Sequence, residues 1–372
     1  MADLFDYVAW RGDLTFEQSP FNELDALIFS QLSYVLLDGA LSDSFEEKKT
    51  LRQLTRDFKN LPDFESRIDI GFLINDRTTD FLFAVANTER VGGVDVCGFR
   101  NIFSEKNVEQ FAALTFILDK DVVISYRGTD DTIIGFEEDF RISYIDQIPA
   151  QKDALDYFRD AKDAFPRSKF TLVGHSKGGN LAVNTAVKCD KKLRKRIDAI
   201  YNFDGPGFKK EFFETEEYLE IEPILYSYYP SFSVVGMLFH HPNNYKVIES
   251  TKFAIMQHDA MCWCVSGKSF VTKEDFTDEC KVFAGAFNSW VDRITDEEKE
   301  DFVNCLFSLI KASGYKTNLE IEKNALTASA RIIGAYAKMD KEKKDEFKDI
   351  FMLFVNAVKS ELPVFNKLPL SI

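Results

Sequence analysis

The chain has 372 residues, of which 45% are hydrophobic and 14% aromatic. This composition excludes a disordered chain, and the length predicts a catalytic domain with an added subdomain, because single cores stop growing at roughly 250–300 residues. The formal net charge is −15. An acidic surface repels polyanions, so we expect no nucleic acid among the partners of this protein.

The cysteines and the N-terminus indicate the compartment. The six cysteines are scattered, and Cys262 and Cys264 are separated by one residue rather than by the two or more of a zinc knuckle. We therefore expect free thiols in a reducing cytoplasm and no metal. The N-terminal segment Met1–Asp6 is acidic, unlike a signal peptide, and the chain has no run of about 18 apolar residues. These patterns predict a soluble protein without a transmembrane segment.

The first part of the chain predicts both helices and strands. Apolar residues at helical spacing favour a helical region with a polar break near residues 42 and 43. Several short apolar runs indicate strands, and a second amphipathic helix follows them. In chain order the ranges are 22–58 for the helical region, 69–74, 80–86, 112–118 and 121–126 for the strands, and 150–164 for the second helix.

The middle of the chain predicts a parallel sheet. A strand at 170–173 leads into a glycine-rich turn, a helix at 180–187, and further strands at 197–203 and 223–229, which is the order of a sheet with crossover helices. Residues 245–248 and 253–256 also have strand-like patterns, and charged helical segments dominate from residue 275. We predict an α/β-hydrolase fold with a mostly parallel sheet flanked by helices, with residues 1–274 as the catalytic domain and 275–372 as a helical C-terminal subdomain.

The glycine-rich turn contains a G-x-S-x-G motif with Ser176 at its centre. The sequence G-H-S-K-G spans residues 174–178, between the apolar strand and the apolar helix. A nucleophilic serine in this fold needs such a tight strand-to-helix turn, and small flanking residues prevent clashes with neighbouring strands. The alternatives are a glycine-rich turn with an idle serine, or a phosphate-binding loop, although the spacing of phosphate-loop motifs is missing. The setting predicts Ser176 as a nucleophile.

Two backbone N–H groups are candidates for an oxyanion hole. Lys177 opens the helix after the serine, where free N–H groups and the helix dipole favour negative charge. Thr129 follows the strand at 121–126 in the turn Arg127-Gly128-Thr129, where an ordinary turn is the alternative. The side chains of Lys177 and Arg127 either favour an acidic substrate or point to solvent.

Few residues are candidates for the general base, because the chain has only four histidines. We expect the side chain of His175 to point away from the reactive side of the neighbouring serine. In this fold the base follows the last strands, which favours His258, with His240 or His241 as the alternative.

The acid that orients the base is harder to assign. The loop after residues 223–229 contains no carboxylate, only Ser231 and Ser233 as weak hydroxyl partners, and Asp259 is too close to His258 in sequence. Asp204 follows the preceding strand, and we nominate it as the acid; the alternative is that it only shapes the following Gly-Pro turn. Without an acid the imidazolium is less stable and turnover is slower.

Several motifs together resemble known families. The segments Y-R-G-T at 126–129, G-H-S-K-G-G at 174–179 and D-G-P-G at 204–207 are similar to the class 3 lipases. More closely, the chain resembles a bacterial family of Mbeg-like α/β-hydrolase proteins. That resemblance rests on W-R-G-D-L at 10–14, R-G-T-D-D-T at 127–132, E-D-F at 138–140, G-H-S-K-G-G-N-L-A at 174–182, S-V-V-G-M-L at 233–238 and Q-H-D at 257–259.

The lipase resemblance implies a nucleophile at Ser176, oxyanion donors at Thr129 and Lys177, and a base at His258. Where those lipases carry their aspartate, this chain has the region from Ser231 to Ser233, so either the acid has moved to Asp204 or the triad is incomplete. The resemblance implies no particular substrate.

These observations predict a serine hydrolase that acts on small-molecule or lipid esters without a cofactor. A thioesterase or peptidase would use the same residues, and the sequence does not separate them. The alternative from another class is a catalytically weak or inactive binding protein of the same fold. The sequence does not indicate an oligomeric state.

Overall fold

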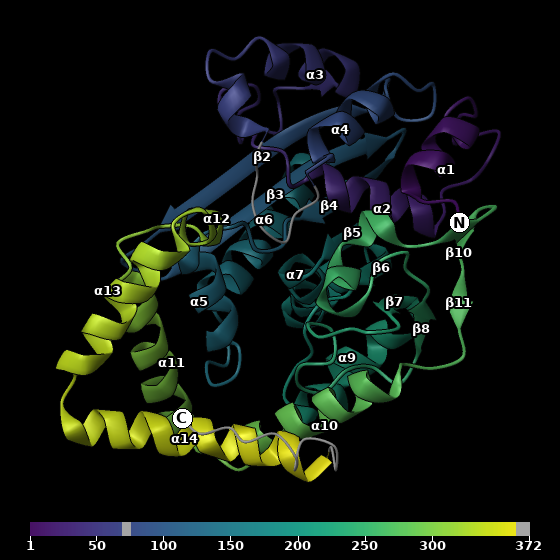
Figure 1. Ribbon diagram of the computed structural model, residues 1–372. Helices are drawn as coiled ribbons and strands as arrows, with labels where there is room; N and C mark the ends of the chain where they lie inside the picture. The colour runs from purple at the N-terminus through teal and green to yellow at the C-terminus, as the bar shows by residue number, and fades with distance from the viewer. Residues whose placement is uncertain (69–75, 362–372) are drawn as a thin grey trace.

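The computed structural model describes residues 1–68 and 76–361 (Figure 1). Within these residues nine strands form one sheet in the order β1-β2-β3-β4-β5-β6-β7-β8-β11, and β9 and β10 form a separate pair. The strands are β1 Lys49–Thr50, β2 Asp95–Ser104, β3 Glu109–Leu118, β4 Asp121–Tyr126, β5 Phe170–His175, β6 Ile197–Phe203, β7 Leu225–Pro230, β8 Tyr245–Ile248, β9 Val265–Ser266, β10 Ser269–Phe270 and β11 Thr272–Lys273.

The centre of the sheet is parallel. Strands β4 to β8 all run in one direction, whereas the pairs at both edges are antiparallel. Parallel neighbours need crossover connections, which the helices between β4 and β7 supply. The predicted α/β-hydrolase fold is therefore confirmed, with antiparallel edge strands that the sequence patterns did not indicate.

Helices cover both faces of the sheet (Figure 1). The α-helices are α1 Leu4–Arg11, α2 Glu23–Leu32, α3 Leu51–Lys59, α4 Thr78–Ala86, α5 Ile133–Arg141, α6 Pro149–Ala164, α7 Lys177–Lys188, α8 Lys191–Arg194, α9 Glu216–Ile221, α10 Asp278–Val291, α11 Asp296–Lys311, α12 Asn318–Lys323, α13 Ala325–Lys338 and α14 Lys341–Glu361. Short 3₁₀ helices are η1 Phe64–Arg67, η2 Lys210–Glu214, η3 Glu222–Ile224, η4 Ala254–His258 and η5 Ala260–Cys262.

Alternation along the central strands divides the apolar side chains between two cores. In β4, Val123 packs in the core that α1 to α4 cover, while Val122 and Ile124 pack in the core under α6, α7 and α9. In β5, Val173 and Leu172 divide in the same way. Successive side chains of a strand point to opposite faces, so an apolar run without polar alternation is the pattern of a strand buried on both sides.

Two predicted strands are helical, and one lies outside the described residues. Residues 80–86 belong to α4, where Phe81, Leu82 and Val85 are buried on one helix face. A short continuous apolar run has no period that separates a strand from a buried helix, which explains the error. Residues 253–256 lie mostly in η4 rather than in a strand. The region 22–58 contains α2 and α3 separated by a longer non-helical stretch than predicted. The strand predicted at 69–74 falls on residues that are not described.

The C-terminal helices extend from the sheet along α5 and α10 (Figure 1). The Trp290 indole nitrogen on α10 donates to the carbonyl of Ile350 on α14 at 3.1 Å, and Lys311 on α11 pairs with Glu137 on α5. The helical character predicted from residue 275 onward is present in α10 to α14, while a domain boundary at that residue stays a prediction. Among the described residues, no helix has the length and apolar character needed to cross a membrane.

Candidate functional site

The predicted site residues gather at one edge of the sheet. Because β4 to β8 are parallel, their carboxyl ends lie at the same edge, which is where open α/β sheets bind ligands. Thr129 follows β4, Ser176 follows β5, Asp204 follows β6, Ser233 follows β7 and His258 follows β8. The strand order therefore brings together five segments that are far apart in the sequence.

Ser176 lies in a strained turn between β5 and α7. Its φ is 57° and its ψ is −134°, a region that side chains other than glycine rarely adopt and that costs about 1–3 kcal/mol. The flanking glycines are required by space. A Cβ on Gly174 would lie 2.1 Å from the backbone of Gly178, and one on Gly178 would lie 2.0 Å from the carbonyl oxygen of Tyr126. The turn thus has the geometry of a nucleophile elbow.

His258 and Asp204 form a buried pair. The Nδ1 atom of His258 lies 2.6 Å from Oδ2 of Asp204, and the side chains are 6% and 0% exposed. The other carboxylate oxygen of Asp204 accepts a hydrogen bond from the Ser233 hydroxyl. Since a carboxylate only accepts hydrogen bonds, Nδ1 of His258 carries a proton, and in the neutral imidazole the lone pair is then on Nε2. The tautomer is the one that a general base needs.

The serine is fixed beside this pair through its backbone. The N–H of Ser176 donates to the carbonyl of Phe203, the residue before Asp204, at 2.9 Å. Among the hydrogen bonds of the described residues, none joins the Ser176 hydroxyl to the His258 ring. In unliganded enzymes this contact is often long and tightens only with substrate bound.

Two backbone N–H groups lie near the serine. Lys177 is the first residue of α7, so its N–H has no acceptor within the helix. A Cβ on Gly128 would lie 2.9 Å from Cβ of Ser176, which places the 127–129 turn against the serine. The Thr129 hydroxyl donates to Asp139 at 2.5 Å. Its hydroxyl is therefore committed, and the Thr129 N–H has no acceptor among the described residues.

The charged side chains beside the serine are buried, so the alternative that Lys177 and Arg127 point to solvent is wrong. The Lys177 ammonium, 0% exposed, donates to Glu138 at 2.9 Å and to the carbonyl of Gln110 at 2.8 Å. The Arg127 guanidinium is buried and donates to the Asn101 side chain at 3.0 Å. A buried charge needs a partner inside the protein, and neither side chain faces solvent.

The alternative residues from the sequence lie elsewhere. The Ser231 hydroxyl donates to the Gln257 side chain at 3.1 Å, not to an imidazole. His240 pairs through its backbone with Phe208, and the His241 ring packs against Tyr229 and Tyr245. His258 is the histidine that contacts a carboxylate.

Sequence reasoning missed Tyr34 and the role of His175. Tyr34 follows α2 and has no motif around it, so no signal in one sequence identifies it. The His175 ring packs against the ring of His258, with the centroids 4.6 Å apart and the planes tilted by 34°. Glu138 was part of a recognised motif, but its contact with Lys177 is visible only in three dimensions.

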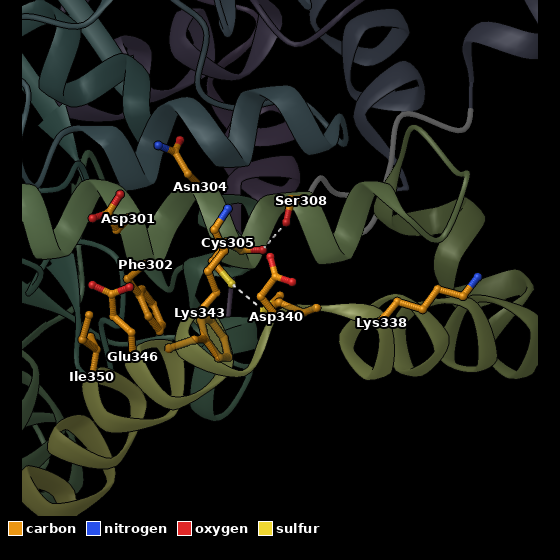
Figure 2. Close-up of a pocket in the computed structure, with 12 residues that line it drawn as sticks. Asp301, Phe302, Asn304, Cys305, Ser308, Lys338, Asp340, Lys343, Glu346 and Ile350 are labelled. Carbon is orange, nitrogen blue, oxygen red and sulfur yellow. Dashed lines mark hydrogen bonds between the residues drawn. The ribbon is translucent and has the colours of Figure 1, made fainter.

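A separate cleft of about 650 Å³ lies between α11, α13 and α14, and Figure 2 shows its lining. Acidic and basic side chains alternate around it, and Cys305 lies 3.9 Å from the Met339 sulfur. No residue of the strand-end cluster lines this cleft. It belongs to the C-terminal helices and not to the candidate site.

A family model described as Mbeg1-like matches residues 85–308, which is more than half of the chain and includes every strand-end residue described above. The chain belongs to the Mbeg1-like family. Its fold is similar to the crystal structure of M37 lipase, with 15% identity, a TM-score of 0.38, and coverage of 59% of this chain and 70% of the other. A comparison with curated proteins gave no match.

The Lys177–Glu138 pair generates a prediction about stability. Glu138→Gln leaves the buried ammonium with only the more distant Asp139 carboxylate, at 3.7 Å, so we expect the free energy of unfolding to fall by about 3 kcal/mol. The double variant with Lys177→Met should recover at least half of that loss, because the buried charge is gone. Chemical denaturation followed by circular dichroism measures both. As the control, Glu105→Gln breaks the exposed pair with Lys316 and should leave the unfolding midpoint unchanged. If Glu138→Gln and Glu105→Gln lost the same free energy of unfolding, the assignment of a stabilising buried ion pair to Lys177 and Glu138 would be contradicted.

Asp139 generates a prediction about pH. Burial raises the pKa of this carboxyl to about 6, against the opposing effects of Lys177 and the Thr129 hydroxyl. Between about pH 4 and pH 6 the folded state then holds a proton that the unfolded state releases, so stability decreases as pH rises through this window. Asp139→Asn should flatten the fall by about 2 kcal/mol, measured as the difference in unfolding free energy between pH 4 and pH 7. An unchanged slope would exclude Asp139 as its source.

Proposed function

We propose that this protein is a serine hydrolase that cleaves carboxylic esters through an acyl-enzyme. Ser176 attacks the ester carbonyl carbon while Nε2 of His258 accepts the hydroxyl proton. His258 then returns that proton to the departing alcohol, and a water molecule activated by the same nitrogen hydrolyses the acyl group from Ser176. Asp204 holds the required tautomer and stabilises the imidazolium that forms at each step.

The observation that carries this proposal is the buried contact between His258 and Asp204 beside a serine in the elbow conformation. The N–H groups of Lys177 and Thr129 support it, since they are the donors available to the oxygen that becomes negative. One such donor is typically worth about 3–4 kcal/mol of barrier lowering. The N-terminus of α7 adds a favourable dipole at the same point.

The alternative of an inactive binding protein rested on the absence of an acid for the base. The contact of Asp204 with His258 at 2.6 Å removes that reason for preferring it. The two cations beside the serine are buried: Lys177 bonds to Glu138, and Arg127 bonds to Asn101. We therefore favour neutral esters over strongly anionic ones.

Covalent labelling tests the nucleophile. A fluorophosphonate probe should label the wild-type chain and not Ser176→Ala, because the probe reacts only with an activated serine. Ser308→Ala on α11 is the matched control and should label as the wild type does, since its hydroxyl only bonds to its own helix. Equal labelling of Ser176→Ala and the wild type would reject Ser176. No labelling of any form would favour the binding protein.

Turnover tests the acid. With the best substrate from p-nitrophenyl esters, acyl-CoAs and short peptides, Asp204→Asn should lower kcat by about 10⁴, because an amide no longer enforces the tautomer of His258. Asp198→Asn, on the exposed side of the same strand, is the control and should keep the wild-type kcat. A loss of less than about tenfold in Asp204→Asn would show that another group orients the base.

A further inference from the structure

A chain of hydrogen bonds runs from Tyr34 through His175 to the backbone of His258. The Tyr34 hydroxyl lies 2.9 Å from Nδ1 of His175, and Nε2 of His175 lies 2.8 Å from the carbonyl oxygen of His258. Tyr34 and His175 are each 4% exposed. Both hydrogen bonds are buried, so water does not compete for their donors and acceptors.

The direction of this chain is determined by its end. A carbonyl oxygen only accepts hydrogen bonds, so Nε2 of His175 must carry a proton. A neutral imidazole then has its lone pair on Nδ1, which accepts a hydrogen bond from the Tyr34 hydroxyl. Burial lowers the pKa of His175 well below its usual value and raises that of Tyr34 well above its own, so both groups keep this state near neutral pH.

The segment that His175 holds is exposed up to residue 256, and the Gln257 side chain beside the base accepts hydrogen bonds from the Ser231 hydroxyl and the Phe232 N–H. Residues 251–256 are exposed, and the Phe253 side chain is 79% exposed. The carbonyl of Gln257, the residue before His258, accepts a hydrogen bond from the Trp263 indole at 2.8 Å. Two consecutive carbonyls are therefore fixed by ring N–H groups, and the His258 side chain begins at the second of them.

Tyr34 also touches the elbow and the oxyanion turn. Its hydroxyl lies 3.3 Å from the His175 carbonyl, and a Cβ on Gly128 would lie 2.1 Å from the same hydroxyl oxygen. One hydroxyl thus borders the segments that carry Ser176 and Thr129, and through His175 it reaches the segment that carries His258. Neither Tyr34 nor His175 lies within hydrogen-bonding distance of the Ser176 hydroxyl or the His258 ring nitrogens among the described contacts.

We propose that Tyr34 and His175 are positioning residues, which fix the backbone of His258 relative to Ser176 and the oxyanion turn. This inference rests on the proposed hydrolase function. Tyr34 holds His175 in its Nε2–H tautomer, and His175 in turn holds the His258 backbone in place. No proton is transferred through His175.

Kinetics test the proposal with a matched pair of tyrosines. Tyr34→Phe should lower kcat by about 10- to 100-fold with little change in KM, because small misplacement of a catalytic group slows the chemical step. Tyr157 is the control: it is also fully buried, and its hydroxyl has two partners, Thr115 at 2.7 Å and the Gly98 carbonyl at 2.5 Å. Tyr157→Phe should lose similar stability and keep its kcat. Equal kcat losses in both variants, or none in Tyr34→Phe, would overturn the proposal.

A second pair of variants separates the hydrogen bond from ring packing. His175→Phe keeps the ring volume but removes the donor to the His258 carbonyl, whereas His175→Gln keeps an N–H donor. We expect His175→Phe to lose kcat as Tyr34→Phe does, and His175→Gln to recover a measurable part of it. Equal losses in the two variants would overturn the role of the hydrogen bond.

The tautomer of His175 tests the proposal without any activity. The chain has only four histidines, so ¹⁵N-histidine spectra of the full chain can be assigned with His175→Gln. We expect the His175 ring to show a protonated Nε2 and an unprotonated Nδ1 from about pH 5 to pH 9, and its Nδ1 signal to shift in Tyr34→Phe. If His175 titrates in this range, or shows the opposite tautomer, its positioning role is rejected even if the enzyme is active. If the wild type hydrolyses no ester, the hydrolase proposal fails while this spectrum still decides the tautomer.

Discussion

The site depends on how closely the backbone approaches itself at the carboxyl ends of β4, β5 and β6. A Cβ on Gly178 would lie 2.0 Å from the Tyr126 carbonyl at the end of β4, and one on Gly205, just after β6, would lie 2.9 Å from the Ser176 carbonyl. Only glycine permits these approaches, because any side chain would displace a strand end. The nucleophile turn is therefore compressed between its neighbours, and that compression holds Ser176 in a conformation it would not adopt alone.

The same crowding explains why a buried ion pair lies under the serine. Residue 177 follows Ser176, and its side chain enters the interior. Lysine at this position requires a countercharge, and Glu138 supplies it from α5, 39 residues away in the sequence. Glu138 also accepts hydrogen bonds from the N–H groups of Gln110 and Ala150. The E-D-F and G-H-S-K-G-G motifs are thus two halves of one charge pair, which ties α5 to the elbow.

The central strands and the chain order of the site could be predicted because they depend on local patterns. Apolar runs bounded by glycine identified β4 to β7 within one or two residues, and the elbow motif identified Ser176. The apolar run of α4 failed because burial on one helix face and burial in a strand give the same composition over seven residues. β2 was missed because its pattern is interrupted by Gly98, a residue with φ of 63°, and by polar residues at its exposed end.

Side-chain partners were the part that sequence could not provide. Asp204 was nominated only from the end of a strand, and the contact with His258 depends on the relative positions of β6, β7 and the loop after β8. The pairs Tyr34–His175 and Lys177–Glu138 are separated by 141 and 39 residues, so no spacing rule connects them. Such contacts follow from strand order, which is fixed by many crossover connections together rather than by any one segment.

The Asp204 carboxylate reaches His258 because of the backbone conformation of Asp204. Asp204 has a φ of 53°, and its N–H donates to the Tyr228 carbonyl of β7 at 2.8 Å, so the chain turns across the end of the next strand. The loop after β7, where the lipases carry their aspartate, places Ser233 at the other carboxylate oxygen. In this chain that loop contributes a donor to the carboxylate instead of the carboxylate itself. The two oxygens of Asp204 are then satisfied by different partners, which holds the plane of the carboxylate and with it the direction of the bond to Nδ1 of His258.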